Sequence, residues 1–168
     1  MNQINLFIEL TRLKKPIGYM LLFWPCAWGL TLGFDFSNNI NLYIFYLILF
    51  FLGAVLMRSA GCIVNDILDR KFDKKVFRTK NRPLAANKLK IKDAYFILFI
   101  FLLGSFFITL SLPENGRFLS IILSLVALPL ILIYPSAKRW FKFPQAILSI
   151  CWGFSVLIPW AAHEGNLN

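Results

Sequence analysis

Residues 40–73 read INLYIFYLILFFLGAVLMRSAGCIVNDILDRKFD. The first part, Ile40 to Val64, is almost entirely apolar, and roughly 20 such residues in a helix cross the ~30 Å hydrocarbon core of a bilayer. Polar and charged residues follow at once, beginning with Asn65. This stretch predicts a membrane-spanning helix whose end carries a charged face.

Four more apolar blocks are long enough, or nearly so, to span a bilayer as helices. They are Ile17 to Phe34, Ala94 to Leu112, Phe118 to Tyr134 and Phe143 to Ala162. The composition agrees, because 58% of the 168 residues are hydrophobic and only 15% are charged, whereas a soluble domain carries about 25% charged residues. The sequence therefore predicts an all-α fold, a polytopic transmembrane helical bundle with about five spans.

The net charge of +10 is concentrated in alternate loops. Basic residues gather in 12–15, 70–92 and 138–142, whereas 35–39 and the tail after residue 163 carry none. This alternation predicts that the N-terminus and the 70–92 segment lie in the cytoplasm. We identify no reading helix or aromatic platform among these charges, so nucleic acid is not an expected partner.

Asn65, Asp66, Asp69 and Asp73 fall within an arc of roughly 100° on a helix, which is a single face. Ionised carboxylates three and four residues apart repel one another, so this face requires a cation. Oxygen ligands of this kind select a hard cation such as Mg²⁺. The alternative is that these aspartates pair with the basic residues of 70–75 on a solvated helix end.

Arg58 lies inside an apolar block, one to two turns before Asn65 and on nearly the same helical face. An arginine near the middle of a membrane costs on the order of 3 kcal/mol, so it is predicted to face a polar cavity; the alternative is that it snorkels to the surface. Arg78 and Arg82 follow in the loop beside it, and guanidinium groups suit phosphate oxygens. The sequence thus predicts anion-binding groups next to the acidic face.

The acidic face and its loop carry a family resemblance. The pattern Asn65-Asp66-x-x-Asp69-x-x-x-Asp73, followed by Arg78-Thr79-x-x-Arg82-Pro83-Leu84, resembles the first aspartate-rich motif of the UbiA superfamily of intramembrane prenyltransferases. Two further segments agree, Arg12-Leu13-x-Lys15-Pro16-Ile17-Gly18 with Trp24-Pro25, and Tyr134-Pro135-Ser136-Ala137-Lys138-Arg139 with Pro144-Gln145. Within the superfamily, Gly18, Trp24-Pro25 and Gly61-Cys62 look most like the branch that prenylates 4-hydroxybenzoate.

The resemblance implies a bundle of about nine spans in the cytoplasmic membrane of a bacterium, with a central cavity open to the lipid bilayer. It implies an Mg²⁺-dependent transferase of ubiquinone biosynthesis that moves a polyprenyl group from polyprenyl diphosphate to the ring of 4-hydroxybenzoate. By the same resemblance, Asn65, Asp69 and Asp73, with Asp66 beside them, hold the Mg²⁺ and serve catalysis.

Substrate-binding residues are also implied by the resemblance. Tyr134 and Lys138 contact the diphosphate, and Arg139 is the first choice as partner of the benzoate carboxylate. Arg58 and Lys15 are weaker choices for that carboxylate. The alternative for Lys138 and Arg139 is a positively charged anchor at the end of a span.

One feature of the family pattern is missing. The resemblance implies a second aspartate-rich motif, but the sequence has no aspartate after Asp93 and stops at Asn168. We therefore expect residues 1–168 to be a single UbiA-type prenyltransferase domain truncated before that motif, and inactive by itself. A degenerate product and one half of a split enzyme are the alternatives.

Two other functions stay open at this point. The chain can be a non-catalytic membrane protein for lipid binding or assembly, which retains the acidic loop. It can also belong to another UbiA branch with a different aromatic acceptor. Binding of a prenyl diphosphate that depends on magnesium distinguishes the enzyme lineage from the non-catalytic protein.

Overall fold

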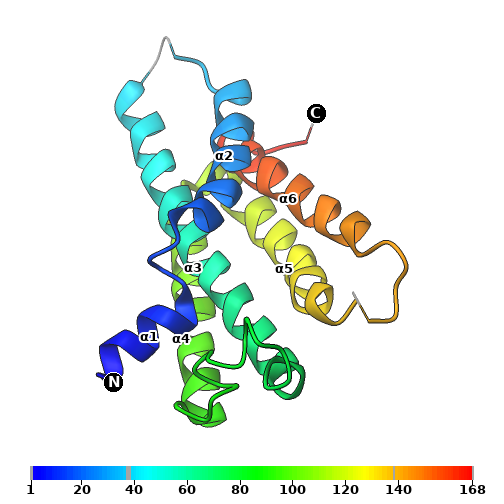
Figure 1. Ribbon diagram of the computed structural model, residues 1–168. Helices are drawn as coiled ribbons and strands as arrows, with labels where there is room; N and C mark the ends of the chain where they lie inside the picture. The colour runs from blue at the N-terminus through cyan, green and yellow to red at the C-terminus, as the bar shows by residue number, and fades with distance from the viewer. Residues whose placement is uncertain (1, 37–38, 138, 168) are drawn as a thin grey trace.

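The computed structural model describes residues 2–36, 39–137 and 139–167. Across these residues the chain forms helices and no strands (Figure 1). The helices are α1 (Gln3–Thr11), α2 (Pro16–Gly33), α3 (Ile40–Asp73), α4 (Ile91–Leu110), α5 (Glu114–Ala137) and α6 (Pro144–Glu164). The predicted all-α class is confirmed, and the two termini lie at opposite ends of the bundle.

Four helices, α3 to α6, are long and apolar enough to cross a membrane. They coincide with four of the five predicted blocks, and the chain is an integral membrane protein. The remaining predicted block forms α2 at its predicted place, but α2 is not among the four helices that are long and apolar enough to cross a membrane. The reason is physical, since α2 has 18 residues and its glycines, prolines and tryptophans lower its mean hydropathy.

The short helix α1 is not among the predicted elements. It ends at Arg12, whose backbone is left-handed with φ 56°. Leu10 is fully buried in a cluster with Ile63, Leu84 and Ala94, which joins α1 to α3, α4 and the 74–90 loop. The helix therefore depends on tertiary contacts, as is usual for a helix of 9 residues.

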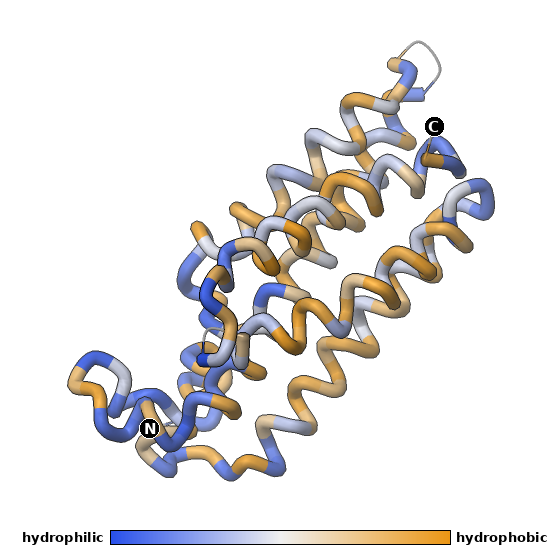
Figure 2. The backbone as a smooth tube through the Cα atoms, turned by 90° about the vertical axis from the view of Figure 1, so that its right-hand side faces the viewer, coloured by the Kyte–Doolittle hydropathy of each residue, from blue (hydrophilic) through white to orange (hydrophobic). Residues whose placement is uncertain are grey.

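Helix α3 is the longest element, with 34 residues. The side chain of Asn39 caps its first turn by accepting hydrogen bonds from the backbone nitrogens of Asn41 (3.1 Å) and Leu42 (3.2 Å). The helix continues without a break from the apolar residues into the acidic face and ends at Asp73. Figure 2 shows hydrophilic residues gathered at the end of the bundle that carries the N-terminus, with apolar residues along the helices.

Helix α6 packs tightly between α2 and α5. A Cβ atom on Gly29 would lie 2.2 Å from the carbonyl oxygen of Val156, and one on Gly116 would lie 2.1 Å from that of Ala161. At the far end of the bundle the hydroxyl of buried Tyr46 donates to the carbonyl oxygen of Ala162 at 3.0 Å. These contacts fix α2, α3, α5 and α6 around a common interior.

Candidate active site

The acidic face of α3 meets arginines from three other parts of the chain. Asp66 is 2% exposed, and its Oδ1 atom accepts from Arg12 Nη2 at 2.5 Å and from Arg82 Nη1 at 3.2 Å. Arg82 Nη1 also donates to Asp73 Oδ2 at 2.8 Å. A single guanidinium from the 74–90 loop thus bridges two turns of α3, while Arg12 fastens the end of α1 to the same carboxylate.

Asp69 has its arginine partner beyond the end of α5. Arg139 Nη2 donates to Asp69 Oδ1 at 2.5 Å and to the carbonyl oxygen of Leu68 at 3.0 Å. Its guanidinium carbon lies 4.5 Å from the centre of the Phe72 ring. Arg139, predicted to hold the acceptor, therefore contacts α3 itself in this structure.

Two basic residues next to the aspartates in the sequence, Arg70 and Lys74, contact the 74–90 loop. Arg70 donates to the carbonyl oxygen of Leu84 (3.1 Å) and to Asn87 Oδ1 (2.8 Å), and Lys74 Nζ donates to the same Asn87 oxygen at 3.1 Å. These bonds shape the 74–90 loop. The alternative from the sequence was that the aspartates pair with the basic residues of 70–75. Arg70 and Lys74 instead bond to the loop that carries Arg82.

Asn65 joins the acidic face to a cavity. Its side-chain nitrogen donates to the carbonyl oxygen of Gly61 at 3.1 Å, which leaves the side-chain oxygen available as an acceptor or ligand. Asn65 also lines the cavity, which has a volume of about 540 Å³ and lies among α2, α3, α4, α5 and α6. The polar face and the cavity therefore meet at this residue.

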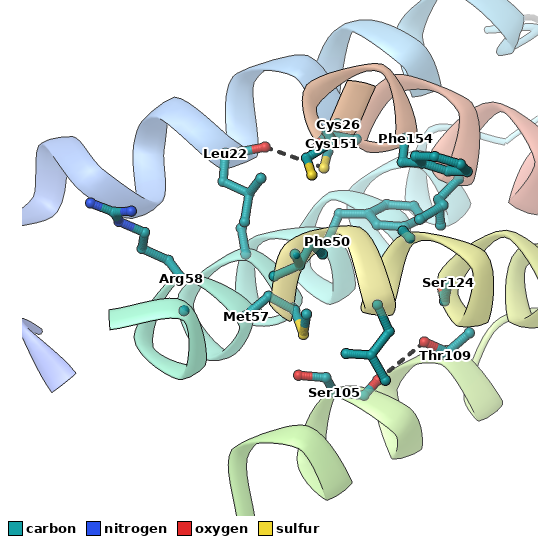
Figure 3. Close-up of a pocket in the computed structure, with 18 of the residues that line it drawn as sticks. Leu22, Cys26, Phe50, Met57, Arg58, Ser105, Thr109, Ser124, Cys151 and Phe154 are labelled. Carbon is teal, nitrogen blue, oxygen red and sulfur yellow. Dashed lines mark hydrogen bonds between the residues drawn. The ribbon is translucent and has the colours of Figure 1, made fainter. Parts of the chain in front are cut away.

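The cavity is mostly apolar (Figure 3). Leu22, Phe50, Met57 and Phe154 line it. Three of its hydroxyl groups, those of Ser105, Thr109 and Ser155, donate to backbone oxygens of their own helices. Thr109 Oγ1, for example, donates to a backbone oxygen one turn earlier at 3.1 Å. The wall therefore presents mainly carbon, which suits a hydrocarbon chain.

The predicted substrate-binding residues lie in different places, and two of them, Arg82 and Arg139, contact the aspartates of α3. Arg58 and Tyr134 line the cavity, whereas Arg78 is exposed in the 74–90 loop. Neither Arg58 nor Arg78 has a hydrogen bond or ion pair with another described residue. Lys138 lies outside the described residues.

Arg12 is the site residue that sequence reasoning missed. It belongs to the segment ending at Gly18 that carries part of the family resemblance, and this was the available signal. In 2–36, 39–137 and 139–167, no three acidic, histidine or cysteine side chains are grouped so that they could hold a metal. The aspartates contact arginines in this structure, and the Mg²⁺ site stays a prediction.

Comparisons with known proteins agree on one family. The sequence model of the UbiA prenyltransferase family matches residues 22–168. A 4-hydroxybenzoate octaprenyltransferase from Dechloromonas aromatica (strain RCB) is 46% identical over 166 residues, which are 98% of this chain and 53% of that protein. The protein of the same name from Legionella pneumophila (strain Lens) is 39% identical over 164 residues, which are 98% of this chain and 55% of that protein.

The fold has solved counterparts. A UbiA homologue from Archaeoglobus fulgidus, bound to DMAPP and Mg²⁺, superposes with a TM-score of 0.66 at 17% identity, over 94% of this chain and 53% of that one. At that identity the likeness concerns the fold. The chain spans about half the length of the curated relatives it matches.

Proposed function

Because the chain belongs to the UbiA prenyltransferase family, we propose that it carries part of the site that transfers a polyprenyl group from polyprenyl diphosphate to the ring of 4-hydroxybenzoate, in ubiquinone biosynthesis. The relatives named for that reaction are about twice as long as the region they share with this chain. The complete reaction and its acceptor are therefore part of the proposal.

One observation carries this proposal, the junction at Asn65. On one side of it lies a row of carboxylates with arginines against them, and on the other a mostly apolar cavity of about 540 Å³. A prenyl diphosphate has the same division, with a charged head and a hydrocarbon tail. We propose that the head binds at the row and the tail enters the cavity.

The oxygen donors of the row fit Mg²⁺. Asn65 has its nitrogen bonded to Gly61, so its oxygen is free to face the metal, and Asp69 and Asp73 supply carboxylates one and two turns further on. Asp66 lies beside them and holds Arg12 and Arg82. When bound, Mg²⁺ neutralises charge on the diphosphate leaving group.

The arginines have a second role in this proposal. Arg82 and Arg139 neutralise the carboxylates in this structure, and we propose that they turn to the diphosphate oxygens when substrate enters. Arg78, Tyr134 and Lys138 complete the contacts to the diphosphate. Charged and polar groups of this kind stabilise negative charge as it develops on the leaving group.

The cavity wall protects the reactive carbon. The allylic C–O bond breaks and its electron pair leaves with the diphosphate, and a ring carbon of the acceptor then forms the new C–C bond and loses its proton. Apolar side chains such as Met57 and Phe50 exclude water from the allylic cation during this step.

We also propose an orientation in the membrane. The end of α3, the 74–90 loop and the N-terminal segment carry most of the basic residues, and they gather at one end of the bundle (Figure 2). The positive-inside rule supports a position of this end on the cytoplasmic side of a bacterial inner membrane. The diphosphate would then enter from the cytoplasm.

The test is binding of geranyl diphosphate to the purified chain in detergent, with and without Mg²⁺. We expect binding that requires Mg²⁺ and is lost in Asp69→Asn, which keeps the shape of the side chain and removes its charge. Asp93→Asn is the matched control, because Asp93 is exposed in the first turn of α4, away from the row. Binding that ignores both Mg²⁺ and Asp69→Asn would instead support a non-catalytic lipid-binding or assembly role.

A further inference from the structure

A groove runs between α1 and the start of α4, apart from the cavity at Asn65. Its volume is about 420 Å³, and both helices and Leu89 of the preceding loop line it. Figure 1 shows α1 beside the N-terminal end of α4. The ring centre of Phe7 on α1 lies 6.0 Å from that of Phe101 on α4, so α1 packs on the apolar part of α4. The groove is therefore a feature of the packed fold.

The groove crosses the boundary between the polar start and the apolar remainder of α4. Asp93 lines it from the first turn of that helix, and the long apolar block begins with the next residue. Phe96 and Ile97 line it beyond that point, and α1 contributes polar Gln3 and apolar Ile4. Because α4 is long and apolar enough to span a membrane, this boundary lies near the bilayer surface. A ligand that fills the groove must be polar at one end and hydrocarbon at the other.

Asp93 supplies a carboxylate at the polar end of the groove. It is exposed, and it forms no hydrogen bond or ion pair with another residue in the described part of the chain. A carboxylate in this state favours a cationic group that donates hydrogen bonds. Lys90 and Lys92 are exposed next to it in the sequence and can pair with an anionic group. The groove thus fits a headgroup that carries both charges.

We infer that the groove binds a phosphatidylethanolamine molecule of the surrounding bilayer. The lipid ammonium donates to Asp93, Lys90 and Lys92 supply cations for its phosphate, and an acyl chain lies against Phe96 and Ile97. The trimethylammonium of phosphatidylcholine has no N–H donor, so the carboxylate distinguishes these two zwitterionic lipids. The site is separate from the row of carboxylates on α3 and does not rest on the proposed function.

The test compares phosphatidylethanolamine, phosphatidylcholine and phosphatidylglycerol with identical acyl chains. Each lipid is titrated against the full 168-residue chain in detergent, and native mass spectrometry measures the fraction of protein that retains lipid. We expect the parent to bind phosphatidylethanolamine roughly threefold to tenfold more tightly than phosphatidylcholine. Asp93→Asn keeps the shape of the side chain and removes its charge, so it is expected to abolish this preference.

Two further variants separate headgroup recognition from other effects. Glu9→Gln removes a carboxylate from an exposed position of α1 that does not line the groove, and it is expected to keep the preference. Ile4→Ser makes the apolar end of the groove more polar, so it is expected to weaken both zwitterionic lipids by about twofold to fivefold. Ile4 is 61% exposed, and melting temperatures within a few degrees of the parent establish that each variant is folded.

Three results would overturn the inference. The first is equal affinity of the parent chain for phosphatidylethanolamine and phosphatidylcholine, and the second is a preference that persists in Asp93→Asn. The third is tighter binding of phosphatidylglycerol than of phosphatidylethanolamine, which would assign the lysines to an anionic lipid surface. These outcomes are independent of Mg²⁺-dependent binding of geranyl diphosphate, which tests the proposed function.

Discussion

Arg12 and Asp66 form an ion pair across 54 positions of the sequence, with Nη2 and Oδ1 2.5 Å apart. The pair joins the end of α1 to the first carboxylate of the acidic face. Since Arg82 contacts the same oxygen, one buried carboxylate holds together α1, α3 and the loop that follows α3. Asp66 is thus a structural centre of the site as well as a predicted member of it.

Removal of this carboxylate is expected to destabilise the fold. Asp66→Ala leaves two arginines facing each other without an anion, and breaking a buried pair in this way costs about 3–5 kcal/mol. Arg12→Gln is expected to cost less, because Arg12 is 25% exposed and Arg82 remains on Asp66. The measurement is unfolding in detergent, followed by circular dichroism. The control is Asp93→Ala, and equal stability of Asp66→Ala and Asp93→Ala would contradict the central role of Asp66.

Arg82→Gln is expected to change two affinities in opposite directions. The substitution releases Asp66 and Asp73 from their shared guanidinium, so Mg²⁺ alone should bind more tightly. It also removes a donor to phosphate oxygens, so inorganic pyrophosphate should bind roughly tenfold more weakly in the presence of Mg²⁺. Isothermal titration with each ligand measures both changes. A change of the same sign for both would reject the exchange of Arg82 between carboxylates and diphosphate.

The contact of α6 with α2 gives a test of the fold itself. Gly29→Ala places a Cβ 2.2 Å from the carbonyl oxygen of Val156, so the two backbones must move apart, at a cost of about 1–3 kcal/mol or more. Gly153→Ala on α6 meets no atom within 4 Å and is expected to be neutral or stabilising by up to about 1 kcal/mol. Melting temperatures of the two variants check this difference. A harmless Gly29→Ala would contradict the close packing of α2 on α6.

Tyr46 provides a smaller test at the far end of the bundle. Tyr46→Phe leaves the carbonyl oxygen of Ala162 without its donor in a buried site, which is expected to cost about 1 kcal/mol. Tyr95→Phe removes the same hydroxyl from a residue that is 54% exposed, and is expected to cost nothing measurable. A comparison of the two unfolding curves isolates the hydrogen bond, and equal curves would mean that it contributes nothing.

The helices of this fold follow from the sequence more directly than its contacts do. Long apolar blocks mark α3 to α6, because a membrane-spanning helix needs an uninterrupted apolar run. Helix α1 contains no long apolar run. Leu10 is buried only because Ile63 and Leu84 meet it in the folded chain, and a helix this short gives little signal by itself.

In the site, too, the helix follows from the sequence and its contacts with other parts of the chain do not. Helical spacing places Asn65, Asp69 and Asp73 on one face of α3, and they do lie on one continuous helix. Their neighbours could not be read from spacing, since Arg82 and Arg139 reach them through a loop and the end of another helix. Sequence proximity offered the basic residues beside them as partners instead, and two of these, Arg70 and Lys74, bond to the 74–90 loop.

The length of α3 has a consequence for its surroundings. Its 34 residues extend roughly 51 Å, and the apolar part from Ile40 to Val64 alone extends roughly 37 Å, which exceeds a hydrocarbon thickness of ~30 Å. Such hydrophobic mismatch is relieved by leaning of the helix or by local thickening of the lipid. A tilt of α3 changes the position of Asp69 relative to Arg139. We therefore expect the distance between these two side chains to depend on the acyl-chain length of the surrounding lipids.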